Sequence, residues 1–344
     1  MHFFLAFCKL PEHSASRHIE QIRQIRNNGT IMTAARFLKA LRKTPEPAFK
    51  TIRFFIVLMI PVSFGVMLLD KSGILLWIAY FTSPLMGFMG LQGEAALVLL
   101  SSIFLNVYSA IAVIESLNFS VREIIILATL STIAHNFPVE CMILKKAGSS
   151  LTLVVLVRFF SAIAAAWVLN LILPSAPAME GAAILLPGAI GIDPGELPAA
   201  IRSWLVNSFF FILKVSLIIL AVIFIQKLLE EFGIIQVMGK AMSPLMRILG
   251  LSANTGYIWI VTNVIGLAFG SAALLEEIRS GSLSPSEASR INYHAAISHS
   301  QIEDNLLFVA LGVPFLWAAL PRFFMAIIVV WLGNAAMWLY NRRA

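Results

Sequence analysis

The sequence predicts an all-α polytopic membrane protein. Its mean hydropathy is +0.87, and 59% of its residues are hydrophobic while only 12% are charged. Several apolar runs approach or exceed the roughly 20 residues that a helix needs to cross about 30 Å of hydrocarbon. A transmembrane barrel would show short alternating segments, so the pattern favours helices. The runs are Phe54–Leu69, Ala95–Ile114, Leu151–Leu173, Phe209–Ile225, Tyr257–Leu275 and Phe315–Trp338.

The two halves of the chain resemble each other. The stretch SPLM at Ser83 recurs at Ser243, an offset of 160, and the stretch RFF at Arg158 recurs at Arg322, an offset of 164. Matches in one order over such a length indicate a duplication, and the second copy has gained four residues near positions 279–286. We therefore expect a basic N-terminal segment 1–50, a first repeat 51–173, a Pro- and Gly-rich linker 174–203 and a second repeat 204–344.

Basic residues predict how the repeats are oriented. Ten of the 25 Lys and Arg residues lie in residues 1–53, against three acidic residues, and none lies between Arg158 and Arg202. By the positive-inside rule, both termini are cytoplasmic and the linker is external, so the basic excess faces the anionic inner leaflet rather than nucleic acid. Each repeat then crosses an odd number of times, which makes the repeats inverted. Residues 30–43 read equally well as an amphipathic surface helix and as a disordered basic tail.

Each repeat is expected to contain about three spanning helices, an amphipathic interfacial segment and a re-entrant hairpin. In the first repeat the spans are Phe54–Leu69, Glu94–Ile114 and Leu151–Leu173, and the interfacial segment is Gly73–Gly90, broken by Pro84. Pro138 interrupts residues 120–146 next to polar side chains, which predicts a hairpin from the cytoplasm with its tip at His135–Pro138. Residues 287–311 would form the mirror hairpin, with its tip at His299–Glu303.

Polar side chains gather in two matching stretches, IAHNFPVE (133–140) and ISHSQIED (297–304). Polar groups are costly inside apolar segments, so such clusters usually mark a site. The groups could hydrogen-bond a nucleobase and sugar, take protons or sodium for coupling, hold a transition metal or simply close the hairpins structurally. The metal alternative uses His135, Glu140, His299 and Glu303. The predicted substrate-binding residues here are His135, Asn136, Glu140, His299, Ser300, Gln301, Glu303 and Asp304.

A second polar element follows each SPLM stretch. It contains Gln92 and Glu94 in the first repeat and Asn254 in the second. Small residues followed by a carboxylate or amide are typical of an unwound break, whose free N–H groups could face a polar ligand, but helix N-capping explains them equally well. We include all three in the predicted central site, and we expect Arg158 and Arg322 to anchor the hairpin carboxylates rather than bind solute.

Two short stretches resemble a known family. NVIGL (263–267) followed by GSAA (270–273) is similar to the spore-maturation pattern of the nucleoside recognition, or Gate-domain, membrane proteins. LQGEAA (91–96) loosely resembles the Gly-Gln-Thr-Glu-Ala-Pro motif of concentrative nucleoside transporters, with Leu91, Gly93 and Ala96 in place of Gly, Thr and Pro. The resemblance covers about residues 50–338 and implies that Gln92 and Glu94 touch a nucleoside-like solute. The family also includes the gates of ferrous iron transporter B proteins, whose GTPase domain this chain lacks.

Together these features predict a secondary transporter of the cytoplasmic membrane for a small polar, nucleoside-like solute, coupled to protons or sodium. A divalent-metal permease and a non-transporting subunit that docks a partner protein are the alternatives. No catalytic triad, paired-cysteine zinc motif or phosphate-binding loop is present, so an enzyme is the least supported class. We predict no cofactor and no nucleic acid partner; the partners are the solute, the coupling ion and the bilayer. The sequence leaves a homo-oligomer open, and Cys8 and Cys141 are too far apart to suggest a disulfide.

Overall fold

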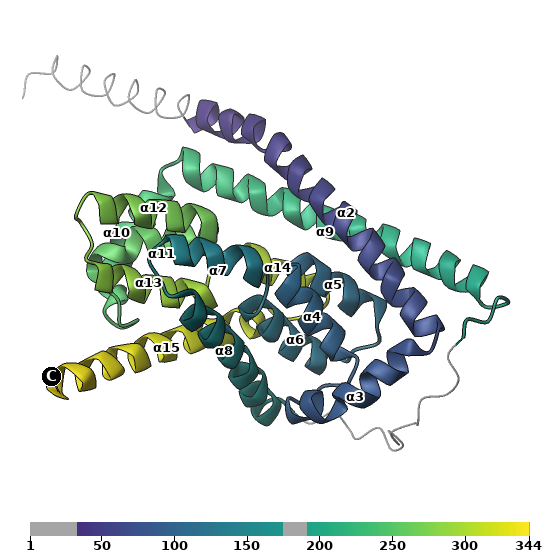
Figure 1. Cartoon of the computed structure of the whole chain (residues 1–344). Coiled ribbons are helices and arrows are strands. Elements are labelled where there is room, and N and C mark those ends of the chain that lie inside the picture. Colours follow the sequence, from purple (N-terminus) through teal and green to yellow (C-terminus); the bar gives the residue numbers. More distant parts are fainter. Residues whose placement is uncertain (1–32, 175–190, 344) are drawn as a thin grey trace, which may run out of the picture.

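The computed structural model describes residues 33–174 and 191–343, and all regular structure in these ranges is helical, as predicted (Figure 1). A helix over residues 33–43 leads into α2, and the basic residues before it lie outside the described ranges. The first half contains α2 (Pro45–Lys71), α3 (Ile74–Phe88), α4 (Ala95–Phe104), α5 (Val107–Ser116), α6 (Val121–Ile133), α7 (Phe137–Lys146) and α8 (Leu151–Ile172).

The second half repeats this order of long and short helices. It contains α9 (Leu197–Glu231), α10 (Ile234–Met246), the 3-10 turn η1 (Ala253–Thr255), α11 (Gly256–Val264), α12 (Leu267–Arg279), α13 (Pro285–Ile297), α14 (Glu303–Val309) and α15 (Phe315–Arg343). Each helix from α2 to α8 thus has a counterpart seven labels later. The long helix α9 begins at Leu197, inside the segment expected to be linker.

The first helices of the two repeats run antiparallel. Lys39 and Lys43, at the start of the first long helix, pair with Glu231 at the end of α9. At the opposite end Lys71 lies 4.0 Å from Glu196. Figure 1 shows α2 and α9 along one side of the molecule in opposite directions. Opposed counterpart helices are what inverted repeats require.

Within residues 33–174 and 191–343, four helices are long and apolar enough to span a membrane: Thr33–Lys71, Leu151–Ile172, Leu197–Glu231 and Phe315–Leu339. The pair α6 and α7 would make a fifth span if it crosses as one bent unit. Their outer surfaces carry exposed large apolar side chains such as Val57, Phe209 and Leu332. Such a surface suits contact with lipid tails rather than water.

Two expected spans, 94–114 and 257–275, are not single helices. Asn106 is extended (φ −171°, ψ −178°), and its side chain accepts a hydrogen bond from the Ser109 amide, which ends α4 and starts α5. In the second repeat Gly266 has a φ of 132° between α11 and α12, a conformation open mainly to glycine. Hydropathy could not predict either break, because the residues before and after it are apolar.

The expected hairpin over residues 120–146 is instead a bent pair. α7 continues from α6 with a change of direction of 42°, whereas α4 and α5 pack against each other. α6 packs against α4, α8 and α15, and most of its side chains are buried. The break between α6 and α7 therefore lies inside the protein, where irregular backbone can find partners.

The recurring Gly-Leu pairs have a local structural role. Gly90 and Gly250 take left-handed φ values of 70° and 75°, and the amides of Leu91 and Leu251 donate to the carbonyls of Met86 and Met246. This is the Schellman pattern that closes a helix C-terminus. Pro84, expected to break its segment, lies inside the continuous helix α3.

Candidate functional site

The two polar stretches fold into matching breaks. Asn136, between α6 and α7, has a left-handed φ of 49°, and Ser300, between α13 and α14, has a φ of 47°. The Asn136 amide donates to the Ser102 carbonyl (2.9 Å), and the Ser300 amide donates to the Thr262 carbonyl (3.0 Å). Non-glycine residues in this conformation are strained and cluster at functional sites. The two copies therefore match in individual backbone hydrogen bonds as well as in sequence.

Each break is held by a buried arginine. Arg158 donates from Nε to the Ile133 carbonyl (2.9 Å) and from Nη2 to the His135 carbonyl (2.9 Å). Arg322 makes the equivalent bonds to the carbonyls of Ile297 (3.3 Å) and His299 (2.8 Å). Both arginines are fully buried, so they need these partners to offset the loss of hydration. Each arginine also pairs with the acid of its break, Arg158 with Glu140 and Arg322 with Asp304, so the expectation that they anchor these carboxylates is confirmed.

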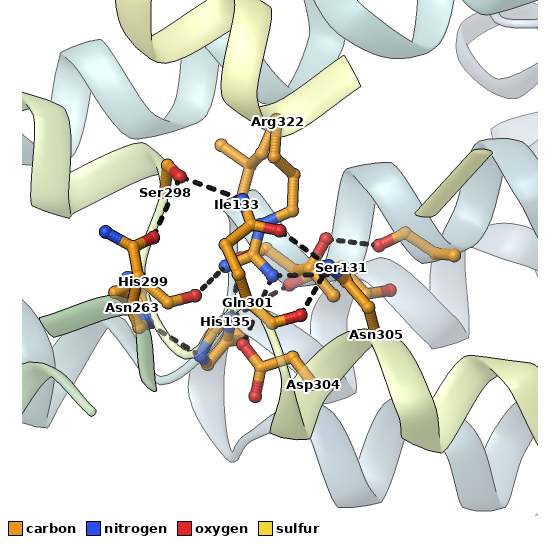
Figure 2. Close-up of polar contacts among 12 residues, drawn as sticks. Ser131, Ile133, His135, Asn263, Ser298, His299, Gln301, Asp304, Asn305 and Arg322 are labelled. Carbon is orange, nitrogen blue, oxygen red and sulfur yellow. Dashed lines mark hydrogen bonds and ion pairs between the residues drawn. The ribbon is translucent and has the colours of Figure 1, made fainter. Parts of the chain in front are cut away.

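His135 and His299 meet where the repeats converge. Their Nε2 atoms are 3.3 Å apart, although 164 residues separate them, and Figure 2 shows the two rings together with the residues that support them. Glu140 joins them: Oε1 lies 3.0 Å from His135 Nε2 and Oε2 lies 3.4 Å from His299 Nε2. The exposed fractions are 4%, 1% and 9% for His135, His299 and Glu140. We call these three residues the histidine–glutamate cluster.

The acids at equivalent positions of the two repeats make different contacts. Glu140 reaches both histidines and also lies 2.8 Å from Arg158 Nη2. Its counterpart Asp304 is one methylene shorter and lies 3.3 Å from Arg322 Nη1, which is also 3.4 Å from the Asn305 Oδ1 atom. The site is therefore symmetric in its histidines and arginines but not in its acids.

Polar side chains on the second repeat extend the site. Gln301 donates to the Ser298 hydroxyl (2.8 Å), which donates to the Asn263 side-chain oxygen (3.3 Å). The Asn305 amide donates to the Gln301 carbonyl (2.8 Å), and Figure 2 shows these residues beside the histidines. Glu303 points to the other repeat, where it accepts a hydrogen bond from the Tyr108 hydroxyl (2.8 Å).

Three predicted residues lie on the elements after the SPLM stretches rather than at the two breaks. The Gln92 side chain is exposed and donates to Glu123 (3.2 Å). Glu94 is the residue before α4 and makes no side-chain capping bond, and Asn254 is exposed in η1. The structure thus separates the elements after the SPLM stretches from the breaks that hold His135 and His299.

Sequence reasoning passed over Tyr108, Ser298 and Asn305. Ser298 lies inside the stretch ISHSQIED but was not among the predicted residues, and Asn305 directly follows that stretch, so a wider window would have included it. Tyr108 gave no signal, because it lies in an apolar run and its counterpart at offset 160 is Ala268. Its contact with Glu303 exists only through the packing of the two repeats.

The expected metal set is brought together in part. His135, Glu140 and His299 each offer a ligand atom, and these atoms lie within 4.8 Å of one another. Glu303, the fourth residue of that set, is not in this group. Its carboxylate is engaged by Tyr108 instead.

The fold and this site define an all-α membrane protein with a duplicated core and a buried polar centre between the copies. The chain is 27% identical over 278 residues to the uncharacterized membrane protein YvoD of Bacillus subtilis (strain 168), covering 81% of this chain and 88% of that protein. No family model matches the chain, and no solved structure matches it.

Proposed function

We propose that this protein is a secondary-type transporter of the cytoplasmic membrane for a small polar solute, with nucleoside-like molecules as the first class to test. The observation that carries the proposal is the meeting of His135, Glu140 and His299, contributed by both repeats at breaks in their helices. Secondary transporters place their sites at repeat interfaces, on discontinuous helices near mid-depth.

Buried charge supports this function over a purely structural one. Arg158, Arg322, Glu140 and Asp304 are all buried, and such groups in a membrane protein commonly mark a solute or ion pathway. A core that only had to be stable would gain as much from apolar residues, because buried ion pairs contribute little net stability. The resemblance of NVIGL and LQGEAA to Gate-domain proteins agrees with this proposal, and the relative YvoD, an uncharacterized membrane protein, agrees with its placement in a membrane.

A polar cavity lies at one end of the long helices α2 and α9. It has a volume of about 240 Å³ and lies between the end of α2, the end of α5 and the start of α9. Asp70, Lys71, Glu115, Trp204 and Asn207 are among its lining residues. In the proposed topology, with both termini cytoplasmic, this cavity faces outward and would receive solute before the repeats rock against each other.

Reconstituted liposomes test the proposal. Uptake of labelled nucleosides, nucleobases and other small polar solutes is measured under imposed proton and sodium gradients. We expect gradient-driven uptake of a solute by the natural protein and a loss of at least about tenfold in His299→Ala and Glu303→Gln, equivalent to about 1.4 kcal/mol or more. Absence of flux for every solute and gradient, with the protein folded and inserted, would contradict transport and favour a subunit that docks a partner.

A further inference from the structure

The two histidines of the cluster are oriented by backbone carbonyls. His135 Nδ1 lies 3.0 Å from the Thr132 carbonyl and 3.2 Å from the Ser131 carbonyl, and His299 Nδ1 lies 2.7 Å from the Ala295 carbonyl. A carbonyl oxygen only accepts hydrogen bonds, so each Nδ1 carries the hydrogen. In a neutral imidazole the other nitrogen, Nε2, then presents a lone pair. Both Nε2 atoms therefore turn lone pairs toward each other and toward Glu140.

Three electron-pair donors cannot stay this close without a cation between them. The Nε2 atoms of His135 and His299 and the Glu140 carboxylate lie 3.0 to 3.4 Å from one another. In addition, Glu140 Oε2 is buried and receives no hydrogen bond of good direction, although Arg158 Nη2 is 2.8 Å away. A proton or a metal ion must therefore occupy the space they share.

The spacing matches a metal ion. Ligand atoms about 2.0–2.1 Å from a tetrahedral zinc ion are about 3.3 Å apart. The two histidine Nε2 atoms are 3.3 Å apart, and each lies 3.0 or 3.4 Å from a different oxygen of Glu140. Two histidines and one glutamate form a ligand set that binds zinc while leaving a fourth position open. Metal-binding histidines also characteristically donate their other ring N–H to a backbone carbonyl or carboxylate.

Both repeats support their histidine with an arginine in the same way. Arg158 fixes the His135 carbonyl and lies against Glu140, and Arg322 fixes the His299 carbonyl. These contacts hold the ligands on helix ends within the buried core, where side chains have little freedom. Arg158 also places a positive charge beside the site, which weakens cation binding and suits an ion that must be released.

We propose that His135, Glu140 and His299 bind one divalent transition-metal ion, of the class that imidazole and carboxylate ligands favour, such as Zn²⁺ or Fe²⁺. The positions of the three side chains support metal binding by themselves. Only the role of the ion as transported cargo rests on the proposed transport function. The ligand set has no thiolate, since the described Cys141 Sγ lies against Arg158 at 3.9 Å. A soft ion such as Cu⁺ is therefore not favoured.

Titration of the purified, metal-stripped protein with Zn²⁺ by calorimetry tests the site. We expect one ion per chain, and affinity more than about 100-fold lower in His135→Gln, His299→Gln and Glu140→Gln, because losing a ligand costs more than losing an outer-shell partner. His294→Gln is the matched control. His294 is a fully buried histidine on α13 outside the cluster, so its variant should bind Zn²⁺ like the natural protein.

A Co²⁺ spectrum of the natural protein tests the site without any variant, so the test does not depend on whether the variants fold. Co²⁺ bound by two histidines and a carboxylate in a tetrahedral site gives strong visible absorption, whereas Co²⁺ on surface carboxylates is octahedral and nearly colourless. We expect the strong spectrum at one equivalent, bleached by Zn²⁺. A weak octahedral spectrum, or Zn²⁺ affinity unchanged in all three ligand variants, would overturn the proposal.

The same liposomes separate this inference from the transport proposal. Metal bound tightly with no Zn²⁺ or Fe²⁺ flux would leave the metal site standing and reject the ion as cargo. Solute uptake by a protein that binds no metal would reject the metal site and leave transport standing, with a proton held between the histidines.

Discussion

Arg158 and Arg322 occupy equivalent positions in the two repeats and make equivalent contacts. Each donates to two carbonyls that the helix break leaves without intrahelical partners, and each lies against the acid that follows the break. A break in a buried helix pair would otherwise leave carbonyls unpaired, at a cost of about 1–3 kcal/mol for each group. The arginines are thus what allows non-helical backbone at the centre of the protein.

Replacing either arginine should destabilise the protein strongly. Arg158→Met leaves Glu140 without its guanidinium and two carbonyls without a donor, and Arg322→Met does the same around Asp304. Removal of one partner of a buried ion pair costs about 3–5 kcal/mol, so both variants should show a clearly lower melting temperature in detergent. Arg202→Met, at an exposed arginine of α9, is the control. A melting temperature equal to that of the control would contradict the anchoring role.

Shortening the acid of the cluster should impair function while preserving the fold. Glu140→Asp keeps the charge but withdraws the carboxylate by about 1.5 Å, the length of one carbon–carbon bond, so it can no longer contact both histidines. We expect weaker Zn²⁺ binding and lower flux, with little change in melting temperature. Glu46→Asp, at an acid outside the core that pairs with Lys50, is the control. Full metal binding and flux in Glu140→Asp would show that the contact with both histidines is unnecessary.

The Tyr108–Glu303 hydrogen bond joins the two repeats. Tyr108→Phe removes the donor from the half-buried Glu303 next to Asp304, so we expect a loss of about 1.5–3 kcal/mol, the range for hydrogen bonds to charged groups. Glu303→Gln keeps an acceptor for the tyrosine and should be more stable than Tyr108→Phe. Melting temperatures of both variants, and of the pair combined, measure the coupling. Additive effects would show that the bond contributes nothing.

The left-handed residue of the second break should tolerate glycine but not a β-branched side chain. Ser300 has a φ of 47°, where glycine is unstrained and a non-glycine residue costs about 1–3 kcal/mol. We expect Ser300→Gly to melt close to the natural protein and Ser300→Val to melt well below it. The amide bond to Thr262 is available to both variants, so equal melting temperatures would argue against strain at this position.

Opposed repeats make a clear prediction for labelling. In a Cys8→Ser background, where Cys141 is buried, cysteine is introduced at Arg42 or at Ala199, which are exposed near opposite ends of the long antiparallel helices. An impermeant maleimide should label Ala199→Cys on intact cells and Arg42→Cys only after permeabilisation. Labelling of Arg42→Cys on intact cells would place the N-terminal segment outside and refute the proposed topology.

The sequence by itself determined the class of protein, the duplication and the residues of the two polar stretches. Apolar runs long enough to cross a bilayer can only be satisfied as helices in lipid, and matched motifs at fixed offsets, from Ser83 to Arg322, reveal two copies whatever their packing. The anchoring arginines could be predicted too, because buried charges need partners and both lie after a polar stretch.

Only the tertiary structure decided where the chain breaks and which polar groups meet. Asn106 and Gly266 interrupt apolar runs that read as single spans, because backbone torsion at one residue leaves no trace in hydropathy. Likewise, Glu140 reaches both histidines whereas Asp304 turns to Arg322, and Tyr108 finds Glu303. These contacts join residues that are far apart in the chain, so they depend on how the copies pack rather than on the local pattern.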